Sequence, residues 1–181
     1  MPRILVPDDV ITAAAVTQDA LRPLVGRDWT GKAGTLDWDV ERTITHMIGA
    51  AAKYTLCLAS RTDHFIALLM TRWPDATNTE MIDSIAPVAA GLAAVARATP
   101  PDVRAYHVSG RTSAAGFAGL ACVEFLVHTD DVLAGFGIPF TPPADLCGAV
   151  LAQRYPGLAQ PGAQPGQQWH RLLAANGRPA R

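Results

Sequence analysis

The chain has 181 residues, of which 49% are hydrophobic and 17% are charged, and its formal net charge at pH 7 is −1. This length and apolar content predict a single domain over residues 1–181 with a full core, and they exclude a disordered chain. The nearly neutral balance, without a basic patch, argues against nucleic acid as a partner.

Cysteine usage and hydropathy indicate the compartment. Cys57, Cys122 and Cys147 are odd in number and widely spaced, which argues against a disulfide framework. Residues 1–10 lack the basic and apolar regions of a signal peptide. The longest apolar region, 44–70, is interrupted by charged and histidine residues, so it is too polar to cross a bilayer. We therefore expect a reduced, cytoplasmic protein with no membrane partner.

Abundant alanine and few β-branched runs favour helices, beginning with two long ones. The first is expected over about residues 9–25. The second begins with Asp39 as its N-cap and extends toward residue 70, with a bend near Ser60, until Pro74 prevents its continuation.

Further helices are expected in the second half of the chain. A third long helix covers about residues 79–99, and a fourth covers about 113–136, with Gly137 as its C-terminal cap. A shorter helix over about 143–154 precedes a surface loop at 156–168, which is rich in proline and glycine. A final short helix covers about 169–176. The sequence therefore predicts an all-α four-helix bundle with short C-terminal helices.

The fourth predicted helix contains a Glu-x-x-x-His-x-x-Asp pattern formed by Glu124, His128 and Asp131. On a helix these side chains fall within about 40° to 60° of each other. The flanking residues are apolar, and burying a carboxylate or imidazole without a partner costs several kcal/mol. His46, on the apolar face of the second helix, offers a third ligand. Two histidines and one carboxylate would leave positions open on a metal, as in catalytic zinc and non-haem iron sites.

A second interpretation needs no metal. His128 and Glu124 would then hydrogen-bond to each other, and His46 would be an ordinary core histidine; the spacing alone does not choose between the two. Asp131 either orients His128 as a hydrogen-bond acceptor or is a polar group near the helix end. Asp130, about 100° further round the helix, is expected to face solvent.

The remaining histidines and two arginines are expected to lie outside this cluster. On a straight helix His64 lies about 27 Å from His46. His107 either lines a cleft or lies on the surface, with the surface favoured, and His170 is expected to be exposed. Surface positions are the default for Arg111 and Arg178, with an anion site as the alternative. The tryptophans are expected to be core or rim anchors. The sequence has no nucleophile elbow or glycine-rich nucleotide motif.

Three segments carry a resemblance to a known family. They are WDVERTITH at 38–46, EFLVHTDDVLAGFG at 124–137 and QWHRLLAANGR at 168–178. Together they resemble the DinB-like superfamily, and more narrowly a metal-binding branch of the mycothiol-dependent maleylpyruvate isomerase N-terminal domain group of actinobacteria.

The resemblance implies a DinB-like bundle that holds a divalent metal through His46, Glu124 and His128, with zinc ahead of nickel or iron. It also implies mycothiol, or another low-molecular-weight thiol, as cosubstrate of a transferase or isomerase with a small-molecule substrate. Asp131 would then orient His128 or handle a proton. The alternative is a non-catalytic protein of the superfamily that binds a metal or a small molecule.

Some features leave the substrate and the assembly open. Asp39, Arg42 and Asp130 depart from the group's pattern, although none of them is a proposed ligand. The alanine-rich third helix, 79–99, leaves room for a homodimer.

Overall fold

A computed structural model describes residues 3–68, 70–159 and 166–179. Within these ranges the regular secondary structure is helical, apart from two isolated β-bridges that join Lys32 to Asp39 and Ala105 to Thr112. The helices, in chain order, are α1 (Asp8–Leu21), the 3₁₀ turn η1 (Arg22–Leu24), α2 (Val40–Ser60), α3 (Asn78–Asp83), α4 (Ile85–Ala98), α5 (Ala114–Gly135), α6 (Ala144–Arg154), the 3₁₀ turn η2 (Pro156–Leu158) and α7 (Gln167–Ala175).

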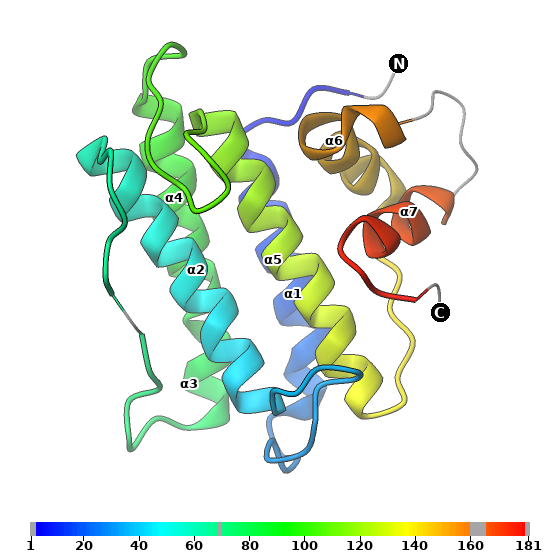
Figure 1. The fold of residues 1–181 in the computed structure, drawn as a ribbon. Helices are drawn as coiled ribbons and strands as arrows, with labels where there is room; N and C mark the ends of the chain where they lie inside the picture. Colours follow the sequence, from blue (N-terminus) through cyan, green and yellow to red (C-terminus); the bar gives the residue numbers. More distant parts are fainter. Residues whose placement is uncertain (1–2, 69, 160–165, 180–181) are drawn as a thin grey trace.

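Four long helices form the bundle. Helix α5 packs between α1 and α2, and α4 packs against the same two helices (Figure 1). Helix α6 lies outside the bundle against α5, and α7 packs against α6. The predicted all-α bundle with short C-terminal helices is confirmed. Helix α5 has other helices on several sides, and side chains all around it are buried.

Side-chain caps explain where the two central helices begin. The Asp39 carboxylate accepts a hydrogen bond from the backbone N–H of Arg42 at 2.7 Å, as predicted for the start of α2. The Ser113 hydroxyl accepts from the N–H of Gly116 at 3.2 Å and starts α5. Gly137, with a φ of 69°, follows the end of α5 and provides the left-handed residue that was expected there.

The second helix is shorter than predicted. It ends at Ser60 because Arg61 takes a left-handed conformation, with a φ of 52°, and the N–H of Thr62 turns back to the carbonyl of Cys57. The carbonyl of Thr62 then accepts from the N–H of Tyr106, so the chain leaves the helix axis. The prediction of a helix reaching residue 70 was therefore wrong, and the described residues of 61–77 run irregularly to the start of α3.

The third predicted helix is two helices, α3 and α4, that meet at Ser84. Pro87 explains the break, because proline has no N–H and its ring conflicts with the carbonyl four residues earlier, that of Asp83. By length and composition alone, Asn78–Ala98 is the one described stretch that could cross a membrane, and core helices of soluble proteins pass the same test. Here α4 packs against α1 and α2 in the bundle.

The predicted surface loop at 156–168 is partly wrong. Its first residues form the exposed turn η2, and α7 already begins at Gln167. Residues 160–165 lie outside the described part of the chain. The final helix contains Trp169, Leu172 and Leu173 on its buried face, as its spacing predicted.

Candidate metal centre

The contact between α2 and α5 brings together the three side chains that the sequence singled out. Nε2 of His46 lies 3.2 Å from Oε2 of Glu124, and Nε2 of His128 lies 3.3 Å from the same oxygen. All three ligand atoms lie within 4.8 Å of one another. The side chains of Glu124 and His128 are 17% and 13% exposed, whereas that of His46 is 39% exposed. The cluster is therefore closed on the α5 side and open on the α2 side.

The donor set fits a divalent transition metal. Zinc binds imidazole nitrogen and carboxylate oxygen at about 2.0–2.2 Å, which places tetrahedral ligand atoms about 3.3 Å apart. The two distances to Glu124 match that separation, and the two histidine nitrogens lie within 4.8 Å of each other. Three protein ligands would leave further positions for a small molecule.

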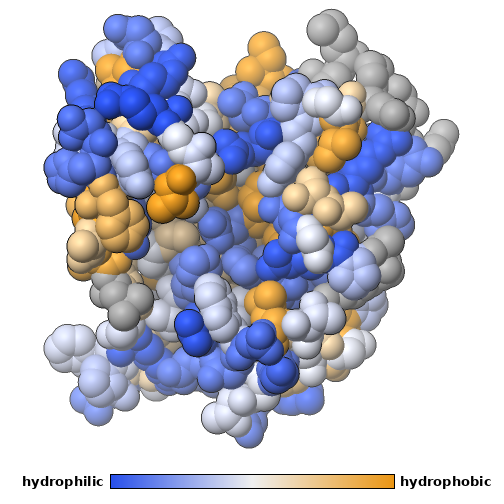
Figure 2. Space-filling view, viewed as in Figure 1, coloured by the Kyte–Doolittle hydropathy of each residue, from blue (hydrophilic) through white to orange (hydrophobic). Residues whose placement is uncertain are grey.

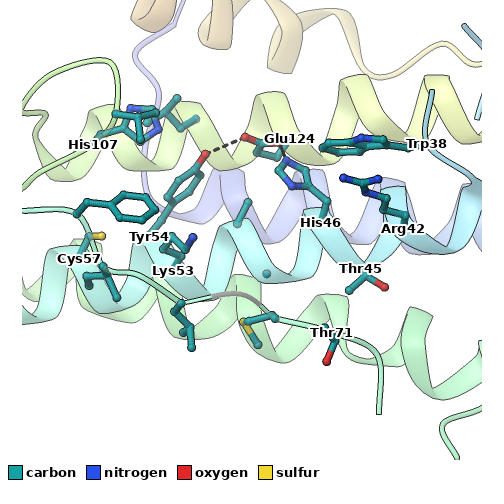
Figure 3. Close-up of a pocket in the computed structure, with 18 of the residues that line it drawn as sticks. Trp38, Arg42, Thr45, His46, Lys53, Tyr54, Cys57, Thr71, His107 and Glu124 are labelled. Carbon is teal, nitrogen blue, oxygen red and sulfur yellow. Dashed lines mark hydrogen bonds and ion pairs between the residues drawn. The ribbon is translucent and has the colours of Figure 1, made fainter. Parts of the chain in front are cut away.

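Glu124 is held in its charged form. Burial alone would raise the pKa of its carboxyl group, but hydrogen bonds from His128 and His46, and their charges, outweigh burial and hold that pKa well below its ordinary range. The Tyr54 hydroxyl donates to the other oxygen of Glu124, Oε1, at 2.8 Å (Figure 3). Burial and the charge of Glu124 raise the pKa of Tyr54, so this hydroxyl remains a donor.

Asp131 orients His128 through the ring nitrogen that does not face Glu124. Its Nδ1 lies 2.9 Å from Oδ2 of Asp131, one helical turn away, as the spacing predicted for an orienting acceptor. Burial lowers the pKa of His128, but hydrogen bonds to Asp131 and Glu124 outweigh this effect and raise it. Burial raises the pKa of Asp131, and hydrogen bonds from His128 and Arg178 more than offset it and lower it.

Trp38 forms an aromatic wall at the start of α2. Its ring centroid lies 4.9 Å from that of His46 in an edge-on arrangement and 6.3 Å from that of His128 in a stacked one. The Arg42 guanidinium lies over the Trp38 ring, 4.6 Å from the centroid. Trp38 therefore fixes the two imidazoles from outside the helices, rather than acting only as a core or rim anchor.

A cavity of about 760 Å³ adjoins the cluster, and His46 and Glu124 form part of its wall (Figure 3). Tyr54, Cys57 and His107 also line it, together with several residues of the irregular segment 61–77. Figure 2 shows hydrophobic and hydrophilic side chains mixed over the face that carries α2 and α5. The cavity is large enough for a small-molecule ligand.

Two cations of α2, Arg42 and Lys53, line the cavity. Among the described side chains neither one pairs with a carboxylate; instead Arg42 lies over Trp38, and Lys53 lies 5.2 Å from the ring centroid of Phe65. These two residues, not Arg111 or Arg178, are the ones that could attract an anionic group into the cavity.

Residues 11–133, more than half of the chain, match the sequence model of the mycothiol maleylpyruvate isomerase N-terminal domain. The chain belongs to this family. The family is DinB-like, so the resemblance seen in the sequence is confirmed. Neither the curated proteins nor the solved structures gave a match.

The region that matches the family begins within α1 and ends at Leu133 in α5. It therefore contains α2 and α4, most of α1 and α5, and the three residues of the cluster. Helices α6 and α7 lie outside it.

Other predictions about single residues had mixed outcomes. His64 lies in the irregular segment, contacting Asp63, and His170 is exposed as expected. His107 lines the cavity, so the less favoured of its two interpretations was correct. Asp130 is buried, with 4% exposure, and the prediction that it faces solvent was wrong. That prediction required a solvent-facing side at that turn of α5, but the neighbouring helices cover it.

Arg178 is the other residue that the sequence placed wrongly. Its side chain is 18% exposed and forms an ion pair with Asp131 at 2.7 Å, instead of lying free on the surface. Tyr54 and Trp38 had no assigned role at the cluster, although both flank His46 by about two helical turns.

Proposed function

We propose that this protein holds a divalent metal ion, zinc in the first instance, through His46, Glu124 and His128. The reaction that we propose is transfer or isomerisation that uses mycothiol, or a similar thiol, and a small-molecule substrate. The observation that carries the proposal is the meeting of three candidate ligand atoms within 4.8 Å, two of them on residues, His46 and Glu124, that line a cavity of about 760 Å³. A cytoplasmic location belongs to the same proposal.

When bound, a metal in this site would lower the pKa of a coordinated thiol and supply a thiolate at neutral pH. The chain's own residues provide the surroundings. Tyr54 keeps Oε1 of Glu124 occupied, which leaves Oε2 directed at the two histidines. Arg42 and Lys53 place positive charge along the cavity, which favours anionic groups on the thiol or on its acceptor.

Asp131 belongs to the proposal as a positioning residue. Its side chain has no exposure and contacts Nδ1 of His128, on the far side of the imidazole from Glu124. We therefore assign it the orientation of His128, rather than a proton transfer with a substrate in the cavity.

A conjugation assay tests this function. The zinc-loaded protein is mixed with mycothiol and the electrophile monochlorobimane, and the fluorescent thioether is followed over time. We expect metal-dependent turnover that a chelator stops and that His128→Ala abolishes. His64→Ala is the matched control, because it removes a histidine outside the cluster, and it should retain full activity. No turnover over a panel of thiols would overturn the proposed reaction and favour the non-catalytic alternative.

A further inference from the structure

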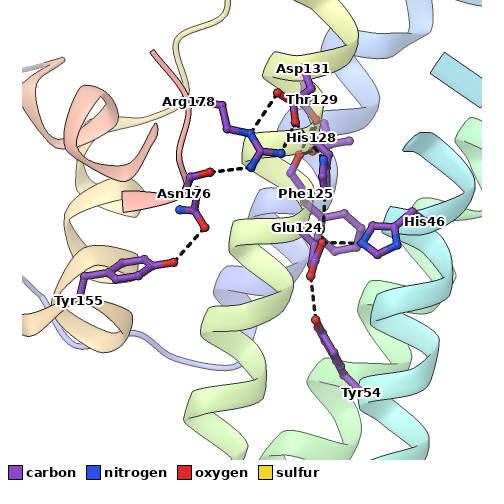
Figure 4. A network of polar contacts seen from close by, with 11 residues as sticks. His46, Tyr54, Glu124, Phe125, His128, Thr129, Asp131, Tyr155, Asn176 and Arg178 are labelled. Carbon is purple, nitrogen blue, oxygen red and sulfur yellow. Dashed lines mark hydrogen bonds and ion pairs between the residues drawn. The ribbon is translucent and has the colours of Figure 1, made fainter. Parts of the chain in front are cut away.

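The support behind His128 extends into the C-terminal part of the chain. The Arg178 guanidinium donates through Nη2 to Oδ2 of Asp131 at 2.7 Å and through Nε to Oδ1 at 3.2 Å (Figure 4). Oδ2 is also the oxygen that lies 2.9 Å from Nδ1 of His128. A line of contacts therefore joins Arg178, Asp131 and His128 to the cluster.

Arg178 is held in place by the end of α7. Gly177 adopts a φ of 72°, and the N–H of Arg178 returns to the carbonyl of Leu173 at 2.9 Å, which turns the chain back toward α5. Nη1 of Arg178 donates to the carbonyl of Asn176 at 2.6 Å, and the Asn176 side chain accepts from the Tyr155 hydroxyl at 2.9 Å.

Burial anchors this arrangement. Trp169, Leu172 and Leu173 of α7 are buried in the same apolar core as the bundle helices. Helix α7 packs on α6, which packs on α5 (Figure 1). The Arg178 guanidinium therefore reaches Asp131 from a docked element. The side chain of Arg178 is correspondingly only 18% exposed.

Asp131 requires such a partner. Its side chain has no exposure, and a buried carboxylate that loses a charged partner is strongly disfavoured. The two nitrogens of Arg178 contact both carboxylate oxygens, and a fork of this kind fixes the plane of the carboxylate as well as its charge. That plane in turn sets the direction from which Oδ2 meets the imidazole of His128.

We propose that Arg178 is a positioning residue of the metal centre, acting through Asp131 on His128. Helix α7 and Arg178, which lie outside the family match, then complete a site whose proposed ligands all lie inside that match. This inference rests on the proposed function in so far as it concerns metal affinity, and it has a second readout in the metal-free protein.

The first test measures zinc affinity in the full chain by competition with a chromophoric chelator. Arg178→Met removes the charge and the fork but keeps an extended side chain. We expect zinc to bind about tenfold more weakly. This is the lower end of the loss that follows when a hydrogen-bond partner of a metal ligand is removed. The zinc affinity of Arg178→Lys should lie between those of the wild type and Arg178→Met, because lysine keeps the positive charge but cannot contact both carboxylate oxygens as arginine does.

Asp145→Asn is the matched control. It breaks another Arg–Asp ion pair of the C-terminal segment, that with Arg3, at an exposed position of α6. It should leave zinc affinity unchanged. If Arg178→Met does not fold, the lysine variant must still bind zinc more weakly than the control.

The second test follows the ring nitrogens of His128 by NMR in the metal-free protein. Arg178→Met should shift these signals, and Asp145→Asn should not. Wild-type zinc affinity together with unchanged His128 ring signals in Arg178→Met would overturn the inference. A wild-type protein that binds no zinc would instead overturn the proposed function, and the ring signals would still decide the role of Arg178.

Discussion

Glu124 divides its two carboxylate oxygens between different partners. Oε2 lies near both histidines, and Oε1 accepts the Tyr54 hydroxyl. Because hydrogen bonds to charged groups are stronger than neutral ones, Tyr54 restricts the rotation of the carboxylate. If a metal binds here as proposed, Tyr54 would therefore favour a contact through Oε2 alone.

Tyr54→Phe tests this restriction. Removing the hydroxyl frees Oε1, and we expect zinc affinity to fall about tenfold, as for other partners of metal ligands. One zinc per chain should still bind at saturation. Tyr106→Phe serves as the control, because it removes a hydroxyl from the same cavity. Equal zinc affinity in the two variants would rule out this role of Tyr54.

The sequence was sufficient to select the three residues of the cluster but not their surroundings. Glu124 and His128 lie one turn apart on one helix, so their proximity follows from helical geometry. The partners Tyr54 and Trp38 depend on how α2 crosses α5, which no local spacing encodes. Arg178 lies 47 residues from Asp131, and only the docking of α7 brings the two together.

At the scale of elements, a close contact ties the loop before α2 to the end of α5. A Cβ atom at Gly135 would meet the backbone carbonyl of Lys32, so glycine is required there. The same loop carries Trp38, whose carbonyl accepts from the N–H of Ala33. This contact therefore helps to hold Trp38 against the histidines.

Gly135→Ala should destabilise the protein. We expect a loss of about 1–3 kcal/mol in the free energy of unfolding, typical of an inserted methyl group that displaces its neighbours. Gly91→Ala in α4 is a matched comparison, because a Cβ atom at that position would meet nothing within 4 Å. It should gain about 0.5–1 kcal/mol from helix propensity. Urea denaturation measures both, and equal effects would refute the close contact.

Helix starts and ends were predictable where a side chain or glycine caps them. Asp39 and Gly137 mark the ends of α2 and α5 that the sequence located correctly. The end of α2 at Ser60 was not predictable in this way, because Arg61 is not a residue type that usually takes a positive φ. The break before α4 had a visible cause, Pro87, which the apolar periodicity concealed.

At the scale of the whole molecule, the cluster lies between α2 and α5, and α6 covers the outer side of α5. Helix α5 is enclosed by the other bundle helices and by α6, which leaves the side chains of Glu124 and His128 mostly buried. Helix α2 instead faces the cavity and the irregular segment 61–77. A small molecule would thus approach from the α2 side, past His46.

The most direct measurement is the zinc content per chain after loading and desalting, determined by elemental analysis. We expect one zinc per chain in the wild type and in His64→Ala, and loss of that zinc in Glu124→Gln and His128→Ala. A wild type without zinc, or His128→Ala with a full equivalent, would contradict metal binding by His46, Glu124 and His128.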